Sequence, residues 1–84
     1  MQNQDVFRYR VVLSHDADSG LVIAEIPSLN LADQGKDGQE ALQNIQDMLS
    51  FHLECLVLEG EEIPREESLE EGLYVQVKVP VVAA

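Results

Sequence analysis

The longest regular pattern in the chain lies between Asp37 and Gly60, where apolar side chains recur at intervals of three and four residues. This spacing places them on one face of a helix and leaves polar side chains on the other face. The apolar positions are Ala41, Leu42, Ile45, Met48, Leu49, Leu53 and Leu56. Asp37 is placed to cap the first turn, with Glu40 at the capping-box position and Gly60 at the end. The sequence therefore predicts one long amphipathic helix.

The rest of the chain carries strand and turn patterns. Apolar and polar residues alternate with a period of two in the first and last predicted strands, and turn-forming residues separate the first strand from the second. The predicted strands are residues 7–13, 21–26, a short segment within 28–35, and 73–79. Pro27 and Pro80 are expected to end the second and fourth strands, because proline lacks a backbone N–H. The order β-β-β-α-β predicts an α+β fold: a small, largely antiparallel sheet with one long helix on one face.

A chain of 84 residues is expected to form one domain close to the lower size limit for a stable core, which an oligomer would help. We assign residues 1–6 to a flexible N-terminus, 7–80 to the domain and 81–84 to a tail. No apolar leader or membrane-length apolar run is present, so a cytoplasmic protein with no membrane contact is expected. The single cysteine, Cys55, cannot form an internal disulfide and is expected to be a small core residue.

Charge narrows the range of partners. The formal net charge is −11, from 16 acidic and 5 basic residues, which argues against nucleic-acid binding and favours a basic protein. Residues 59–72 form an acidic connection that is either a solvated linker or a docking surface. Its candidate partner-binding residues are Glu59, Glu61, Glu62, Glu66, Glu67, Glu70 and Glu71.

Two further surfaces are candidates for contacts. Arg8, Arg10 and Lys78 lie on strand phases that should face away from the helix. Either they are ordinarily solvated and pair across the sheet with Glu25, or this face meets another acidic surface, such as that of a second copy. A homo-oligomer, either a dimer or a tetramer, would form through apolar residues of two elements. These are Phe51 and Leu58, which lie outside the apolar stripe of the helix, and Val75 and Val77 of the last strand.

The residues do not form a convincing catalytic or metal site. The segment beginning at Asp16 has its glycine one position early for a calcium loop, and Pro27 stands where the bidentate glutamate should be. His52 and Cys55, three residues apart on the helix, supply only two ligands, and we expect His52 to be a packed residue. We therefore expect no enzyme activity, metal or cofactor; a residual hydrolase is the least favoured alternative.

The order and spacing of several short motifs resemble the HicB-like antitoxin family over about residues 7–80. The motifs are Glu25-Ile26-Pro27-Ser28-Leu29, Gly35-Lys36-Asp37 followed by Glu40-Ala41-Leu42, and Gly60 followed by Ile63-Pro64. The resemblance implies a truncated ribonuclease-H-like fold without nuclease activity. It also implies binding to a small basic HicA-like toxin that cleaves mRNA. Many members carry a C-terminal DNA-binding module, but residues 73–84 supply only a strand and a tail here, so direct DNA binding is not expected.

Two functions remain open from the sequence. The first is a ribonuclease inhibitor of a toxin–antitoxin system, and the second is a stand-alone, self-assembling structural or regulatory HicB-like module without a toxin. Ionic strength separates them, because a complex held by acidic residues weakens with salt and an apolar or strand-edge dimer does not.

Overall fold

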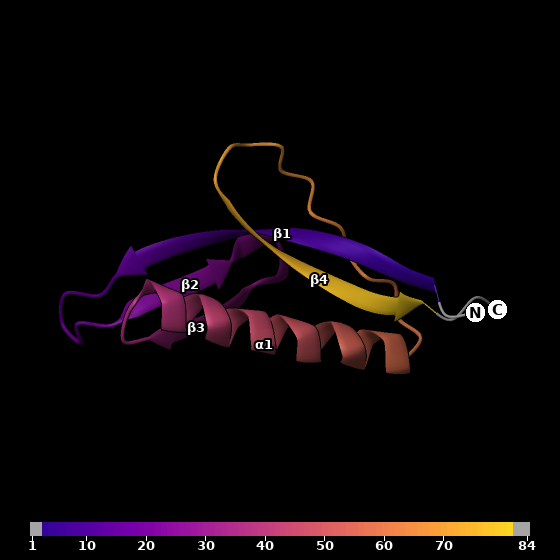
Figure 1. Ribbon diagram of the computed structural model, residues 1–84, viewed down its shortest axis with the longest axis horizontal. Coiled ribbons are helices and arrows are strands. Elements are labelled where there is room, and N and C mark those ends of the chain that lie inside the picture. Colours follow the sequence, from indigo (N-terminus) through magenta and orange to yellow (C-terminus); the bar gives the residue numbers. More distant parts are fainter. Residues whose placement is uncertain (1–2, 82–84) are drawn as a thin grey trace.

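The computed structural model describes residues 3–81 and has the predicted α+β architecture. Its elements are β1 (Asn3–His15), β2 (Val22–Ile26), the 3-10 turn η1 (Pro27–Leu29), β3 (Leu31–Gly35), α1 (Gly38–Leu58) and β4 (Leu73–Val81). The four strands form one antiparallel sheet in the order β3-β2-β1-β4. α1 lies along one face of this sheet, and the long connection to β4 rises on the other side (Figure 1).

The first and last strands along the chain, β1 and β4, are longer than the sequence predicts. β1 begins at Asn3 instead of residue 7, so the part of the predicted flexible N-terminus that the structure describes is a strand. β4 continues through Pro80 to Val81, and residues 78–81 pair with residues 3–6. The two added segments pair with each other, and neither is marked in the sequence by an alternation of apolar and polar residues. Met1, Gln2 and residues 82–84 of the predicted tail lie outside the described residues.

The second and third strands follow the expected local signals. β2 ends at Ile26, and Pro27 opens η1 instead of continuing the ladder. Asn30 then takes a left-handed conformation, with φ of 57°, which reverses the chain into β3. The predicted third strand therefore begins only at Leu31, because η1 occupies the residues before it.

Both ends of α1 are capped as the sequence predicts. The Asp37 carboxylate accepts the Glu40 N–H at 2.8 Å, and the Glu40 carboxylate accepts the Lys36 N–H at 3.0 Å. At the other end Gly60 has a φ of 73° and donates to the Val57 carbonyl, while Glu61 donates to the Leu56 carbonyl. This is the Schellman arrangement, which favours glycine because of its positive φ.

The core lies between α1 and the sheet. Its fully buried members include Tyr9, Ile26, Ile45, Leu49 and Leu53. Cys55 differs from the prediction: it is half-buried at the margin of the helix face, outside this core.

The first turn of α1 lies very close to the backbone of β3 at Gly35. A Cβ atom there would lie 2.4 Å from the backbone nitrogen of Ala41, so the close contact between β3 and α1 requires glycine. Among residues 3–81, no helix is long and apolar enough to cross a membrane.

Candidate partner-binding site

The acidic connection, residues 59–72, crosses β1 as an ordered strap, which we call the acidic strap. It leaves the end of α1 on the helix side of the sheet, passes the edge of β1, and reaches the outer face before entering β4 (Figure 1). It has no helix or strand, but it is attached to the sheet at three places. The sequence predicts its acidity and lack of regular structure, but not these attachments.

The first attachment replaces a missing strand. Because β2 ends at Ile26, the N-terminal half of β1 has no strand on that side, and the N–H of Arg10 lacks a ladder partner there. The Glu66 carboxylate accepts this N–H at 2.8 Å. The same carboxylate accepts the Ser28 hydroxyl at 3.1 Å and the Ser68 N–H at 3.3 Å. Glu66 thus joins β1, η1 and the strap.

The second attachment is made by β1 side chains. The Tyr9 hydroxyl donates to the carbonyl of Pro64. The Arg65 guanidinium lies 4.5 Å from the centre of the Phe7 ring and donates to Asp5 at 3.0 Å. The two aromatic residues of β1, Phe7 and Tyr9, therefore pack in the core and also contact the strap.

The third attachment lies on the outer face. The Tyr74 hydroxyl donates to the Glu70 carbonyl at 2.6 Å and lies 3.3 Å from that of Ser68. Arg10 pairs with the Glu70 carboxylate at 3.7 Å, and the Arg8 guanidinium lies 5.3 Å from the centre of the Tyr74 ring. The strap therefore contacts Arg10 and Tyr74 on the face that carries the predicted basic residues. Arg10 pairs with Glu70 of the same chain instead of forming the cross-strand pair with Glu25.

These attachments shift two pKa values. Burial raises the pKa of Tyr9 above its ordinary value; the positive charge of Arg65 opposes this rise and the negative charge of Glu66 adds to it. Burial also pushes the pKa of Glu66 upward, but hydrogen bonds from Arg10, Ser68 and Ser28 outweigh it and leave the pKa below its ordinary value. Both shifts favour the protonation state that holds the strap at neutral pH.

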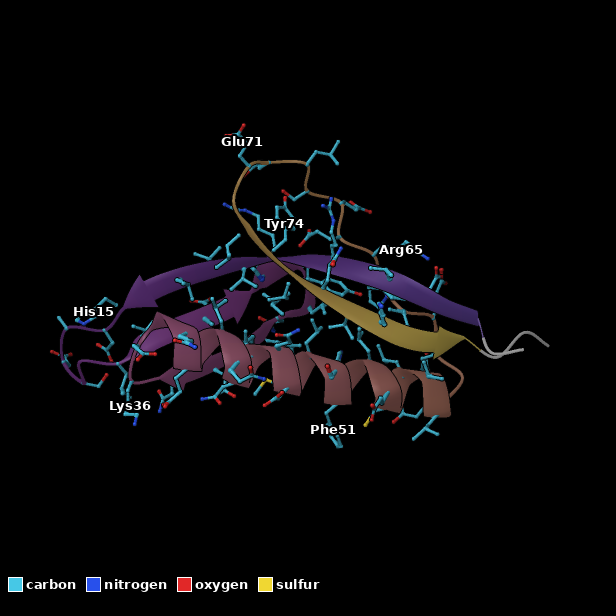
Figure 2. All side chains as sticks on the ribbon, in the orientation of Figure 1. His15, Lys36, Phe51, Arg65, Glu71 and Tyr74 are labelled. Atoms are coloured by element: carbon cyan, nitrogen blue, oxygen red, sulfur yellow. The ribbon has the colours of Figure 1, made fainter. Side chains whose placement is uncertain are left out.

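The seven predicted partner-binding glutamates divide into two groups. Glu66 is half-buried and fully engaged within the chain, and the Glu70 carboxylate pairs with Arg10. The other five are exposed, and no ion pair involves their carboxylates in the part of the chain that the structure describes: Glu59, Glu61, Glu62, Glu67 and Glu71. Figure 2 shows Glu71 at the crest of the strap, directed away from the sheet. The exposed glutamates thus fall into two stretches of the strap, residues 59–62 directly after α1 and residues 67–71 shortly before β4.

The predicted oligomer contacts also divide. Phe51 and Leu58 are exposed, at 69% and 87%, and Phe51 projects away from the sheet (Figure 2). The side chains of Val75 and Val77 are buried beneath the helix, each with 8% exposed. The side chains of these two valines are therefore not available to an interface.

The hairpin carboxylates have a structural use. The Asp16 carboxylate accepts the Ser19 hydroxyl at 2.8 Å and the Asp18 N–H at 3.1 Å, which lowers the pKa of Asp16. In the described range, no group of three His, Cys, Asp or Glu side chains is arranged to hold a metal ion.

Comparison with known proteins identifies a relative by sequence. The chain is 34% identical over 64 residues to UPF0150 protein Ta0767 of Thermoplasma acidophilum; the match covers 75% of this chain and 91% of the relative. The chain belongs to the UPF0150 family. No protein-family profile and no solved structure matches it.

Proposed function

We propose that this protein is a non-enzymatic, HicB-like antitoxin-type module that binds and neutralises a small basic HicA-like ribonuclease. Membership of UPF0150 is consistent with the HicB-like motifs of the sequence. The observation that carries the proposal is the acidic strap, which is attached to the sheet and carries exposed carboxylates on an already anionic protein.

The strap suits a basic ribonuclease for an electrostatic reason. An enzyme that cleaves RNA must present Lys and Arg side chains to phosphate groups, and carboxylates can occupy the same positions. Complementary charge accelerates encounter and fixes orientation. The internal anchors Glu66 and Glu70 lower the conformational entropy that the strap would otherwise lose on binding, because it is already ordered.

The test uses a purified HicA-like ribonuclease from the same genome and measures RNA cleavage with increasing amounts of this chain. We expect cleavage to stop near a 1:1 ratio and inhibition to weaken as ionic strength rises. Replacing Glu67 and Glu71 by lysine should reduce the affinity at least ~10-fold, because both carboxylates are exposed on the strap. Glu66 and Glu70 are kept, so that the strap stays attached.

The matched control reverses two exposed charges away from the strap, Asp18→Lys with Glu25→Lys. It changes the net charge by the same amount as the replacement of Glu67 and Glu71 by lysine. If both variants lose affinity equally, overall charge and not the strap determines binding. If the unchanged protein does not inhibit the ribonuclease at low salt, the proposed function is wrong.

A further inference from the structure

The outer edge of β4 is an open strand edge whose geometry can be worked out from the neighbouring ladder. β4 is the last strand of the sheet, and only β1 pairs with it. In an antiparallel pair, residues alternate between those that hydrogen-bond across the pair and those whose backbone groups point away. The N–H of Arg10 points away from β4, because it bonds to Glu66 on the other side of β1. Its cross-strand neighbour Tyr74 therefore points its own backbone groups to the open edge.

The same alternation assigns the rest of the edge. Gln76 and Lys78 share the phase of Tyr74, so their backbone groups also face outward. The Gln46 amide of α1 donates to the Gln76 carbonyl at 3.3 Å, which agrees with this assignment. A shallow groove follows the edge at this point, lined by Arg8, Gln46, Tyr74, Val75 and Gln76. In the described part of the chain, no other hydrogen bond from outside β1 reaches the backbone of these β4 residues.

Apolar side chains lie beside this edge on the helix face. Leu73 is 40% exposed although its ladder neighbour Val11 is buried. At the other end of the strand, a surface depression is lined by Glu54, Val57, Leu58 and Val79. An exposed leucine and an apolar depression therefore lie at opposite ends of the same open strand, an arrangement that is complementary to itself about a two-fold axis.

We propose that β4 pairs with β4 of a second copy of this chain in an antiparallel ladder centred on Gln76. In this register Gln76 faces Gln76, and Tyr74 of each copy faces Lys78 of the other. Leu73 of each copy lies opposite Val79 of the other, beside the depression that can cover it. The two sheets become one continuous sheet of eight strands.

Other registers are poorer for identifiable reasons. A centre on Lys78 places two like charges opposite each other, which is unfavourable. A centre on Val77 places Tyr74 opposite Pro80, which has no N–H to donate. A centre nearer Leu73 shortens the ladder. The Gln76 register also brings Lys78 toward the Tyr74 ring of the other copy, whose hydroxyl donates to the Glu70 carbonyl of the acidic strap.

The first test is sedimentation equilibrium of the full chain over a range of protein and salt concentrations. We expect a mass twice the 9.4 kDa of one chain. We expect salt to preserve or strengthen the dimer, because screening reduces repulsion between two anionic copies. Gln76→Pro should restore the monomer mass, because it removes an outward N–H that β1 does not use. Lys78→Glu should weaken the dimer at least 10-fold.

Cysteine cross-linking in a Cys55→Ser background tests the register and does not depend on the proline variant folding. Two Gln76→Cys chains would have Cα atoms about 5.5 Å apart, within disulfide range. Two Lys78→Cys chains would be displaced by four residues from each other, or roughly 14 Å, and should not cross-link. A Gln76→Cys disulfide dimer without a Lys78→Cys dimer supports the proposal. A monomer at all concentrations, or cross-linking through residue 78 instead, overturns it.

Discussion

The Glu66 carboxylate gives the sharpest test of the strap, because its replacement can be compared with the same replacement one residue away. Glu66→Ala removes the acceptor for the part-buried N–H of Arg10 and for Ser28 and Ser68. Glu67→Ala removes an exposed carboxylate for which the described structure records no bond as an acceptor. Both substitutions remove one negative charge from the strap.

We expect Glu66→Ala to lower the free energy of unfolding by about 2 kcal/mol, because an unsatisfied N–H and the loss of charge-assisted hydrogen bonds cost roughly 1–3 kcal/mol. Glu67→Ala should stay within about 0.5 kcal/mol of the parent protein. In a domain of this size the larger loss lowers the melting temperature by roughly 8–16 °C. Urea unfolding followed by circular dichroism measures both effects.

The pH dependence of the difference in unfolding free energy between the parent protein and Glu66→Ala tests whether the Glu66 carboxylate causes it. The pKa of Glu66 is lowered in the folded state, so its contribution to stability is present above the unfolded value, about 4.5, and is lost as pH falls through the folded value. The gap between the parent and Glu66→Ala should therefore be full at pH 7 and shrink below about pH 4.5. If the two alanine variants unfold alike at pH 7, or if the gap does not depend on pH, Glu66 does not anchor the strap.

Three further predictions concern the scaffold. Gly35→Ala should destabilise the fold by about 3 kcal/mol or prevent folding, because its Cβ has no room beside Ala41. Gly38→Ala at the helix start should stabilise the fold by about 0.5 kcal/mol, because its Cβ would make only an ordinary contact with the Leu13 side chain. Thermal melts of this matched pair measure both. Asp37→Ala should cost about 1 kcal/mol through loss of the helix cap, measured by urea unfolding. The pKa of Tyr9 is raised on folding, so its contribution is present below the unfolded value, near 10, and is lost as pH rises through the folded value; an alkaline unfolding series should show this loss in the parent protein and not in Tyr9→Phe.

The features that the sequence predicts best depend on residues close together in the chain. The helix, its Asp37 cap and its Gly60 end follow from neighbours within a turn or two, and the structure confirms them. The stop at Pro27 is likewise local, because it follows from the chemistry of one residue.

The features that the sequence misses depend on partners far along the chain. Asn3–Val6 become strand only because the end of β4 reaches them. Glu66 looks like one more acidic residue in a charged run, and its role becomes visible only when Arg10 is known to lack a ladder partner. Val75 and Val77 fit a strand pattern, but the pattern does not say that the helix covers them.

The pairing of β1 with β4 has a consequence for how the protein is made. Phe7 lies opposite Val77, and between them the chain must form β2, β3, α1 and the acidic strap. Contacts between residues so far apart close late and slow folding. During synthesis, the edge of β1 therefore stays unpaired until β4 has been made. A chain interrupted before Leu73 would keep this edge exposed to aggregation or proteolysis. Only a chain that includes β4 can therefore cover this edge of β1.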